Sequence, residues 1–121
     1  MHITLAGIHL EITDAIRTYT LGKMNILEKY VPSNDTSVRL AVSLSKTTNH
    51  HNHGEVFKAE GNMHIRGRDI TLETTQDDLY KAIDTLKDMF TRELAQYKDK
   101  ERSIIRRSAH KVKALFKRLS D

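Results

Sequence analysis

The longest regular pattern in the chain is helical, and it strongly limits how the other segments can fold. Between residues 77 and 98, large apolar side chains recur at steps of three and four: Leu79, Ile83, Leu86, Phe90, Leu94 and Tyr97. This spacing places them on one face of an α-helix, and that face needs an apolar surface to cover. Thr75 and Asp78 have the spacing of a capping box at its start. We therefore expect a helix over residues 77–98 that packs on a core.

The N-terminal part predicts a strand followed by another helix. Residues 2–7 alternate, with Ile3 and Leu5 on one side. A helical apolar stripe then runs over residues 13–30, with Thr13 as its N-cap, and Pro32 ends it. Gly22 lies inside this helix and costs up to about 1 kcal/mol relative to alanine.

Three further segments alternate strictly between apolar and polar residues, as half-buried strands do. They are residues 37–46, 56–65 and 70–74, separated by a polar loop at 47–54 and a tight turn at 66–69. The predicted order is β-α-β-β-β-α. Such an order favours an α+β fold, a two-layer sandwich in which two helices cover one face of a four-stranded sheet.

The C-terminal segment, residues 101–121, predicts a basic amphipathic helix. Ile105, Val112, Phe116 and Leu119 have nearly heptad spacing among many Lys and Arg residues. Residues 1–97 contain 11 Lys and Arg against 13 Asp and Glu, a net charge of −2, whereas residues 98–121 contain 9 against 3, a net charge of +6. A polyanion such as a nucleic acid is the natural counterpart of this concentrated charge.

Other classes of protein are disfavoured by composition. The 121 residues suit one core domain, 1–100, with a tail at 101–121. The absence of cysteine excludes disulfides, thiolate zinc sites and thiol nucleophiles. No apolar run approaches the ~18 residues of a membrane span, and the N-terminus does not resemble a secretory signal. We expect a cytoplasmic location.

The residues give little support to catalysis. His50, His51 and His53 could ligate a metal, but they lie in a polar loop without nearby carboxylate or thiolate partners, so we expect no physiological metal site. A metal-binding protein that uses this loop stays open as a third alternative. Asp84 and Asp88 have Lys87 and Arg92 three or four residues further on, which favours ordinary surface ion pairs over acid–base chemistry. No phosphate-binding loop or nucleophile motif occurs. We predict a protein that is not an enzyme and has no cofactor.

Two motifs resemble those of the ribosome hibernation factors, the family of hibernation promoting factor and protein Y. Residues 78–94, DLYKAIDTLKDMFTREL, are similar to the family pattern D-M-Y-x-A-I-D-x-L-x-D-K-L-x-R-Q-L. Residues 11–29, EITDAIRTYTLGKMNILEK, are similar to E-I-T-x-A-I/L-R-x-Y/H followed by K-L-E-K/R. The resemblance covers residues 1 to about 100 and implies the same β-α-β-β-β-α fold.

The resemblance implies repression of translation without catalysis. The domain would occupy the groove of the small ribosomal subunit, bind its rRNA, and compete with mRNA, tRNA and initiation factors. We expect a monomer off the ribosome and no membrane partner. The RNA-binding candidates, from the matched positions, their neighbours and the tail, are Arg17, Lys23, Lys29, Lys81, Lys87, Arg92, Lys98, Lys100, Arg102, Arg106 and Arg107.

The chain departs from the family pattern at three positions, where Ile26, Met89 and Glu93 replace polar or basic residues. The tail is therefore expected to supply much of the affinity. We also expect no separate dimerisation domain of the kind that long members carry. Whether the protein promotes ribosome dimers or keeps single ribosomes inactive stays open. The alternative is a small adaptor whose basic tail helix docks on a partner protein or an anionic membrane.

Overall fold

The computed structural model describes residues 1–32, 34–49 and 54–120. Its elements are β1 (His2–Ile8), α1 (Asp14–Asn25), the 3₁₀ helix η1 (Ile26–Tyr30), β2 (Arg39–Asn49), β3 (Gly54–Ile65), β4 (Arg68–Gln76) and α2 (Leu79–Ser120). The predicted β-α-β-β-β-α order and the α+β class are confirmed. The chain forms two compact units, Met1–Thr91 and Arg92–Asp121, and each is described by itself.

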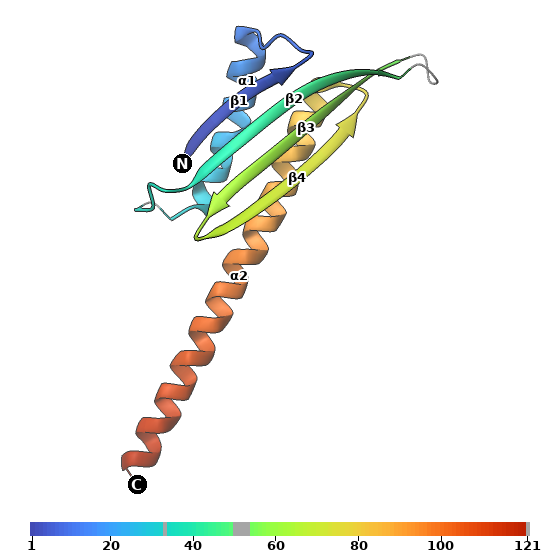
Figure 1. Ribbon diagram of the computed structural model, residues 1–121. Helices are drawn as coiled ribbons and strands as arrows, with labels where there is room; N and C mark the ends of the chain where they lie inside the picture. Colours follow the sequence, from blue (N-terminus) through green and yellow to red (C-terminus); the bar gives the residue numbers. More distant parts are fainter. Residues whose placement is uncertain (33, 50–53, 121) are drawn as a thin grey trace. The chain divides into compact units, whose positions relative to one another are not determined.

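The sheet has the strand order β1-β2-β3-β4 (Figure 1). β1 and β2 are parallel, which requires the crossover through α1, whereas β2, β3 and β4 form antiparallel hairpins. Arg66 and Gly67 form the β3–β4 turn, both with positive φ, at 51° and 75°. Positive φ at both central residues is the requirement of a type I′ turn, which matches the twist of paired strands. Both helices cover the same face of the sheet (Figure 1).

The core lies between that face and the two helices. The alternating residues of β2 are buried as predicted, and so is the stripe of α2 from Leu79 to Leu94, whereas Tyr97 is only half-buried. The main contributors are Val38, Leu40, Val42, Leu44, Ala59, Met63, Met24, Leu27, Ile83, Leu86 and Phe90. Gly61 on β3 leaves room for the Phe90 ring, because a Cβ built on Gly61 would lie 2.5 Å from Cε2 of Phe90.

Several predicted boundaries are wrong. The first helix does not continue as an α-helix to residue 30, because its last turn tightens into η1. Residues 47–49 and 54 belong to strands and not to a loop, since Thr47 pairs with Val56 and Asn49 with Gly54. Backbone hydrogen bonding extends the hairpin where the side chains show no apolar pattern. The histidine loop, residues 50–53, lies outside the described residues.

The start of α2 also differs from the prediction. Thr75 is not its N-cap, because β4 continues to Gln76. Instead, Oδ1 of Asp78 accepts a hydrogen bond of 3.1 Å from the Lys81 backbone N–H. α2 then runs without a break to Ser120, since residues 98–102 contain good helix formers and neither glycine nor proline.

Candidate nucleic-acid interface

The predicted contact residues of the body lie on α1, η1 and α2, and α1 and α2 meet at a group of polar and aromatic side chains. The Tyr19 hydroxyl of α1 donates a 2.7 Å hydrogen bond to Oδ1 of Asp84 on α2. The Tyr19 and Tyr80 rings pack edge to face with centroids 4.8 Å apart. The hydrogen bond to Asp84, together with burial and the carboxylate charge, raises the pKa of Tyr19 to about 12. Asp84 thus joins the two helices.

This group of side chains changes the predicted ion pairs. Asp84 does not pair with Lys87; its Oδ1 lies 3.5 Å from Nζ of Lys23, on the other helix. Lys87 instead places its Nζ 2.5 Å from Asp88. The sequence could not show this, because helical spacing reveals partners within one helix and not across two.

The body cations therefore differ in how free they are to meet a phosphate. Nζ of Lys81 lies 3.9 Å from Oδ1 of Asp77. The amines of Lys23, Lys81 and Lys87 therefore each have a carboxylate within ion-pair distance. Arg17 and Lys29 are exposed and form no ion pair within the described part of the chain. Exposed pairs contribute only about 0 to 1 kcal/mol, and an RNA phosphate can replace the carboxylate. Even so, Arg17 and Lys29 carry the uncompensated charge.

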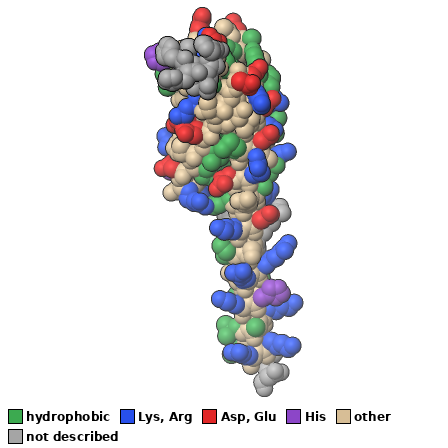
Figure 2. All heavy atoms as spheres, turned by 90° about the vertical axis from the view of Figure 1, so that its right-hand side faces the viewer, with side chains coloured by type: hydrophobic (Ala, Val, Ile, Leu, Met, Phe, Trp, Pro, Cys, Tyr) green, Lys and Arg blue, Asp and Glu red, His purple; other side chains and the backbone are tan. Residues whose placement is uncertain are grey.

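The second unit, Arg92–Asp121, has a different surface. Arg92, Lys98, Lys100, Arg106 and Arg107 are exposed, and the side chain of Arg102 lies outside the described residues. Lys and Arg side chains project from both sides of this helical segment (Figure 2). Large apolar side chains are exposed as well, by 52 to 76%: Ile104, Ile105, Val112, Leu115, Phe116 and Leu119. The tail is a basic amphipathic helix, as its sequence indicates.

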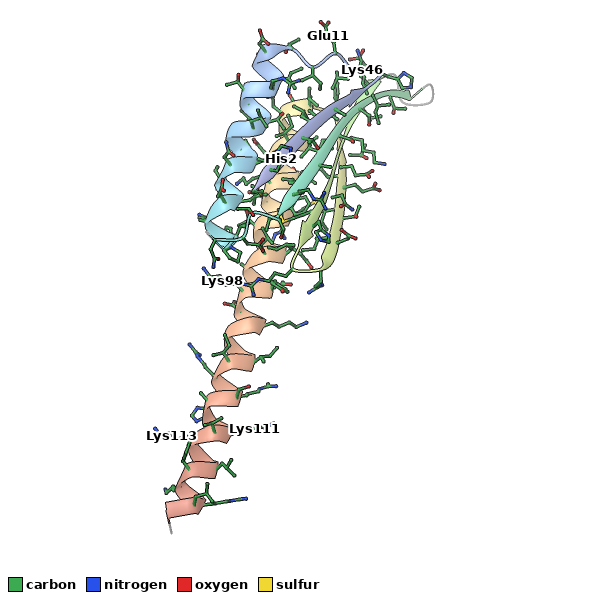
Figure 3. The ribbon with its side chains drawn as sticks, turned by 60° about the vertical axis from the view of Figure 1, so that its left-hand side comes forward. His2, Glu11, Lys46, Lys98, Lys111 and Lys113 are labelled. Carbon is green, nitrogen blue, oxygen red and sulfur yellow. The ribbon has the colours of Figure 1, made fainter. Side chains whose placement is uncertain are left out.

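Two histidines that look isolated in the sequence come together on the open face of the sheet. Strand register places His2, Arg39, His64 and Asp69 in one row across all four strands. They line a hollow of about 460 Å³, whose other lining residues are Thr4, Leu40, Ala41 and Asn62. Figure 3 shows His2 on β1. Only the pairing register reveals this group, which spans 68 positions of sequence from His2 to Asp69.

Two kinds of feature are not found in the described part of the chain. Residues 1–32, 34–49 and 54–120 contain no group of three or more His, Asp or Glu side chains placed to hold a metal ion. The same residues include no helix long and apolar enough to cross a bilayer.

Known proteins resemble this chain over most of its length. Residues 3–102 match the family model described as Sigma 54 modulation protein / S30EA ribosomal protein. The ribosome hibernation promoting factor of Azotobacter vinelandii is 30% identical over 101 residues, covering 84% of this chain and 86% of that protein. The Escherichia coli K12 protein of the same name is 29% identical over 100 residues, covering 83% and 96%.

Solved structures agree with these sequence matches. The N-terminal domain of Thermus thermophilus Protein Y is 32% identical, with a TM-score of 0.67, covering 80% of this chain and 99% of that one. A ribosomal subunit interface protein from Coxiella burnetii shares the fold, with a TM-score of 0.64 at 22% identity, covering 82% and 99%. The comparisons of sequence and of fold therefore point to the same family, and the family model covers residues 3–102. The chain belongs to the Sigma 54 modulation protein / S30EA ribosomal protein family, which includes the ribosome hibernation promoting factors.

Proposed function

We propose that this protein is a ribosome hibernation factor that binds the small ribosomal subunit in the groove for mRNA and tRNA. It represses translation by occupying that groove and stabilises inactive ribosomes, without catalysis. The observation that carries the proposal is the family match over residues 3–102, joined to relatives whose names state ribosome hibernation. The cytoplasm is the corresponding location, and the protein is a monomer when it is off the ribosome.

The charge distribution supports a two-part contact with rRNA. Arg17 and Lys29 offer uncompensated charge on the body, and Lys23, Lys81 and Lys87 follow once phosphates replace their carboxylates. Residues 98–121 add a net charge of +6 against −2 for residues 1–97. Because counterion release scales with the number of phosphates neutralised, the tail supplies much of the affinity and most of the salt dependence.

Sedimentation tests the proposal directly. The purified protein is expected to travel with small subunits on a density gradient at low salt and to be released at high salt. It is also expected to exclude mRNA, tRNA and initiation factors in a competition assay. A protein that stays at the top of the gradient, or that binds while mRNA and tRNA bind normally, contradicts the proposal.

Variants separate the body from the tail. Truncation after Lys100 removes seven Lys and Arg residues and should reduce the slope of log affinity against log salt by up to about 5, at roughly 0.7 per phosphate contact.

The double change Arg17→Gln and Lys29→Gln should weaken binding, whereas Lys46→Gln should not. Lys46 is a suitable control because it lies on β2 and not on a helix, and its Nζ forms a 2.8 Å ion pair with Glu55 (Figure 3). Equal affinity of the truncated and full chains contradicts the role of the tail.

The exposed apolar stripe of the tail favours a second candidate function, an adaptor whose tail docks on a partner protein or an anionic membrane. Phosphate contacts do not require apolar side chains, so the two functions respond differently to their loss. The change Leu115→Gln with Leu119→Gln should leave ribosome binding within about twofold if RNA contact is the role of the tail. If the protein is an adaptor, the same double change should abolish its flotation with anionic vesicles or its binding to the partner protein. The unchanged adaptor should not bind ribosomes.

A further inference from the structure

Part of the hollow on the open face of the sheet is held in place by hydrogen bonds and an ion pair. The His2 backbone N–H donates a 2.9 Å hydrogen bond to the Val38 carbonyl, and the N-terminal ammonium lies 3.1 Å from Glu28. On the other side, Nδ1 of His64 lies 3.0 Å from Oδ1 of Asp69. The start of β1 and the His64 imidazole therefore need little reorganisation when a ligand binds.

The polar groups of the hollow suit a phosphate. The Arg39 guanidinium forms charge-assisted hydrogen bonds with phosphate oxygens in a planar, bidentate geometry. The Asp69 carboxylate can accept a hydrogen bond from Nδ1 of His64, which fixes the orientation of the imidazole ring. Asp69 is the one acidic residue of the lining, and its carboxylate is already engaged with His64.

The floor of the hollow suits a base. Thr4 and Ala41 pair with each other two residues along the strands from His2 and Arg39. Their side chains are short, so they leave open space beside the larger side chains of His2, Arg39 and His64. RNA-binding proteins stack unpaired bases on imidazole rings and guanidinium planes as well as on larger aromatic rings. A volume of about 460 Å³ exceeds the need of an isolated phosphate and fits a nucleotide.

We propose that this hollow binds one nucleotide of single-stranded RNA, with its phosphate at Arg39 and the imidazoles and its base over Thr4 and Ala41. The site is separate from the helix cations, since it lies on the opposite face of the sheet. It rests on the proposed function only for the source of the RNA, which would be an unpaired segment of rRNA or mRNA on the ribosome.

Site-resolved nuclear magnetic resonance on the full chain tests the inference, because it separates the hollow from the basic tail. A single-stranded RNA hexanucleotide should shift the amide signals of His2, Arg39, Ala41 and His64 in a saturable way. Arg39→Gln should weaken binding at these signals by about tenfold or more, as loss of a charge-assisted hydrogen bond does. The matched control is Lys58→Gln, which removes one cation from the same face at the Lys58–Glu73 pair and should change this affinity by less than about twofold.

The choice of ligand identifies which chemical group the hollow recognises. AMP should produce the same shifts at higher concentration, and inorganic phosphate should shift Arg39 and His64 but not Ala41. His64→Gln should weaken the response to phosphate, and an unchanged response would exclude His64 as a contact.

The outcomes keep this inference apart from the proposed function. Shifts confined to the helices and the tail, or equal responses to phosphate and to RNA throughout the hollow, overturn the nucleotide site. If such a protein still sediments with small subunits, the proposed function stands without it. Hollow shifts in a protein that does not bind ribosomes refute the proposed function and leave the nucleotide site in place.

Discussion

Replacing Gly61 by alanine should destabilise the fold, although alanine suits a strand better than glycine does. Gly61 lies on the buried face of β3, opposite Val42, and the Phe90 ring covers it. A Cβ at Gly61 would lie 2.5 Å from Cε2 and 2.9 Å from Cζ of Phe90, and 3.5 Å from Cδ1 of Leu40. Carbon atoms in contact normally stay about 3.5 to 4.0 Å apart. The ring would therefore have to move by about 1 Å.

The size of the effect follows from how firmly that ring is held. Phe90 is fully buried, so its movement displaces other core side chains. Overpacking of this kind costs about 1 to 3 kcal/mol. Alanine in place of glycine recovers about 0.5 to 1 kcal/mol of backbone entropy. We therefore expect Gly61→Ala to lose about 0.5 to 2 kcal/mol of unfolding free energy.

Urea unfolding followed by near-ultraviolet circular dichroism provides the measurement, because three of the four tyrosines, Tyr19, Tyr30 and Tyr80, lie in the unit Met1–Thr91. Gly22→Ala is the matched control. No heavy atom lies within 4 Å of a Cβ built on Gly22, so alanine there should stabilise α1 by up to about 1 kcal/mol. Gly61→Ala combined with Phe90→Leu should show a favourable coupling, since the smaller side chain relieves the clash. A Gly61→Ala variant as stable as the wild type would refute the reasoning.

Three further perturbations test individual contacts. The Asp84 hydrogen bond raises the pKa of Tyr19 to about 12, so this contact stabilises the fold fully below the unfolded pKa of about 10, and the stabilisation is lost as pH rises through 12. Between pH 9 and 12, the unfolding free energy measured with urea should fall more steeply for the wild type than for Tyr19→Phe. Equal slopes would contradict this. Asp78→Ala removes the N-cap of α2 and should lower the unfolding free energy by about 0.5 to 2 kcal/mol, whereas Asp77→Ala should lower it less. Equal effects of the two changes would argue against the cap. Thr20→Val should raise the unfolding free energy by about 1 kcal/mol, because the Thr20 hydroxyl is buried and has no hydrogen-bond partner among the described residues. A much lower melting temperature of this variant would show that the hydroxyl does form a hydrogen bond.

The acidic residues on the helix surfaces shape how the body would meet RNA. Asp77, Asp84 and Asp88 lie beside three of its helix cations, so the body alone presents a weak positive surface. The formal charge of −2 for residues 1–97 agrees with this. Under the proposed function, the exposed basic helix would compensate for this by raising the rate and strength of association with rRNA.

Local pattern was sufficient for the element order and for the buried faces. The strand alternation and the α2 stripe each have a period that only one secondary structure can bury, so Leu40, Val42, Ile83 and Phe90 were predictable as core residues. The ends of elements were less predictable. β2 reaches Asn49 and Thr75 lies in β4 because pairing with a neighbouring strand extends these segments, and such pairing leaves no mark in the local sequence.

The contacts between elements required the folded chain. Asp84 has suitable cations at helical spacing on its own helix, yet it meets Tyr19 and Lys23 because α1 and α2 lie side by side. In the same way, His2 and His64 are 62 positions apart and become neighbours of one hollow only through the register of the sheet. Periodicity is a property of one segment and specifies which face it buries. Partners across segments depend on how those faces are docked, and only tertiary packing sets that.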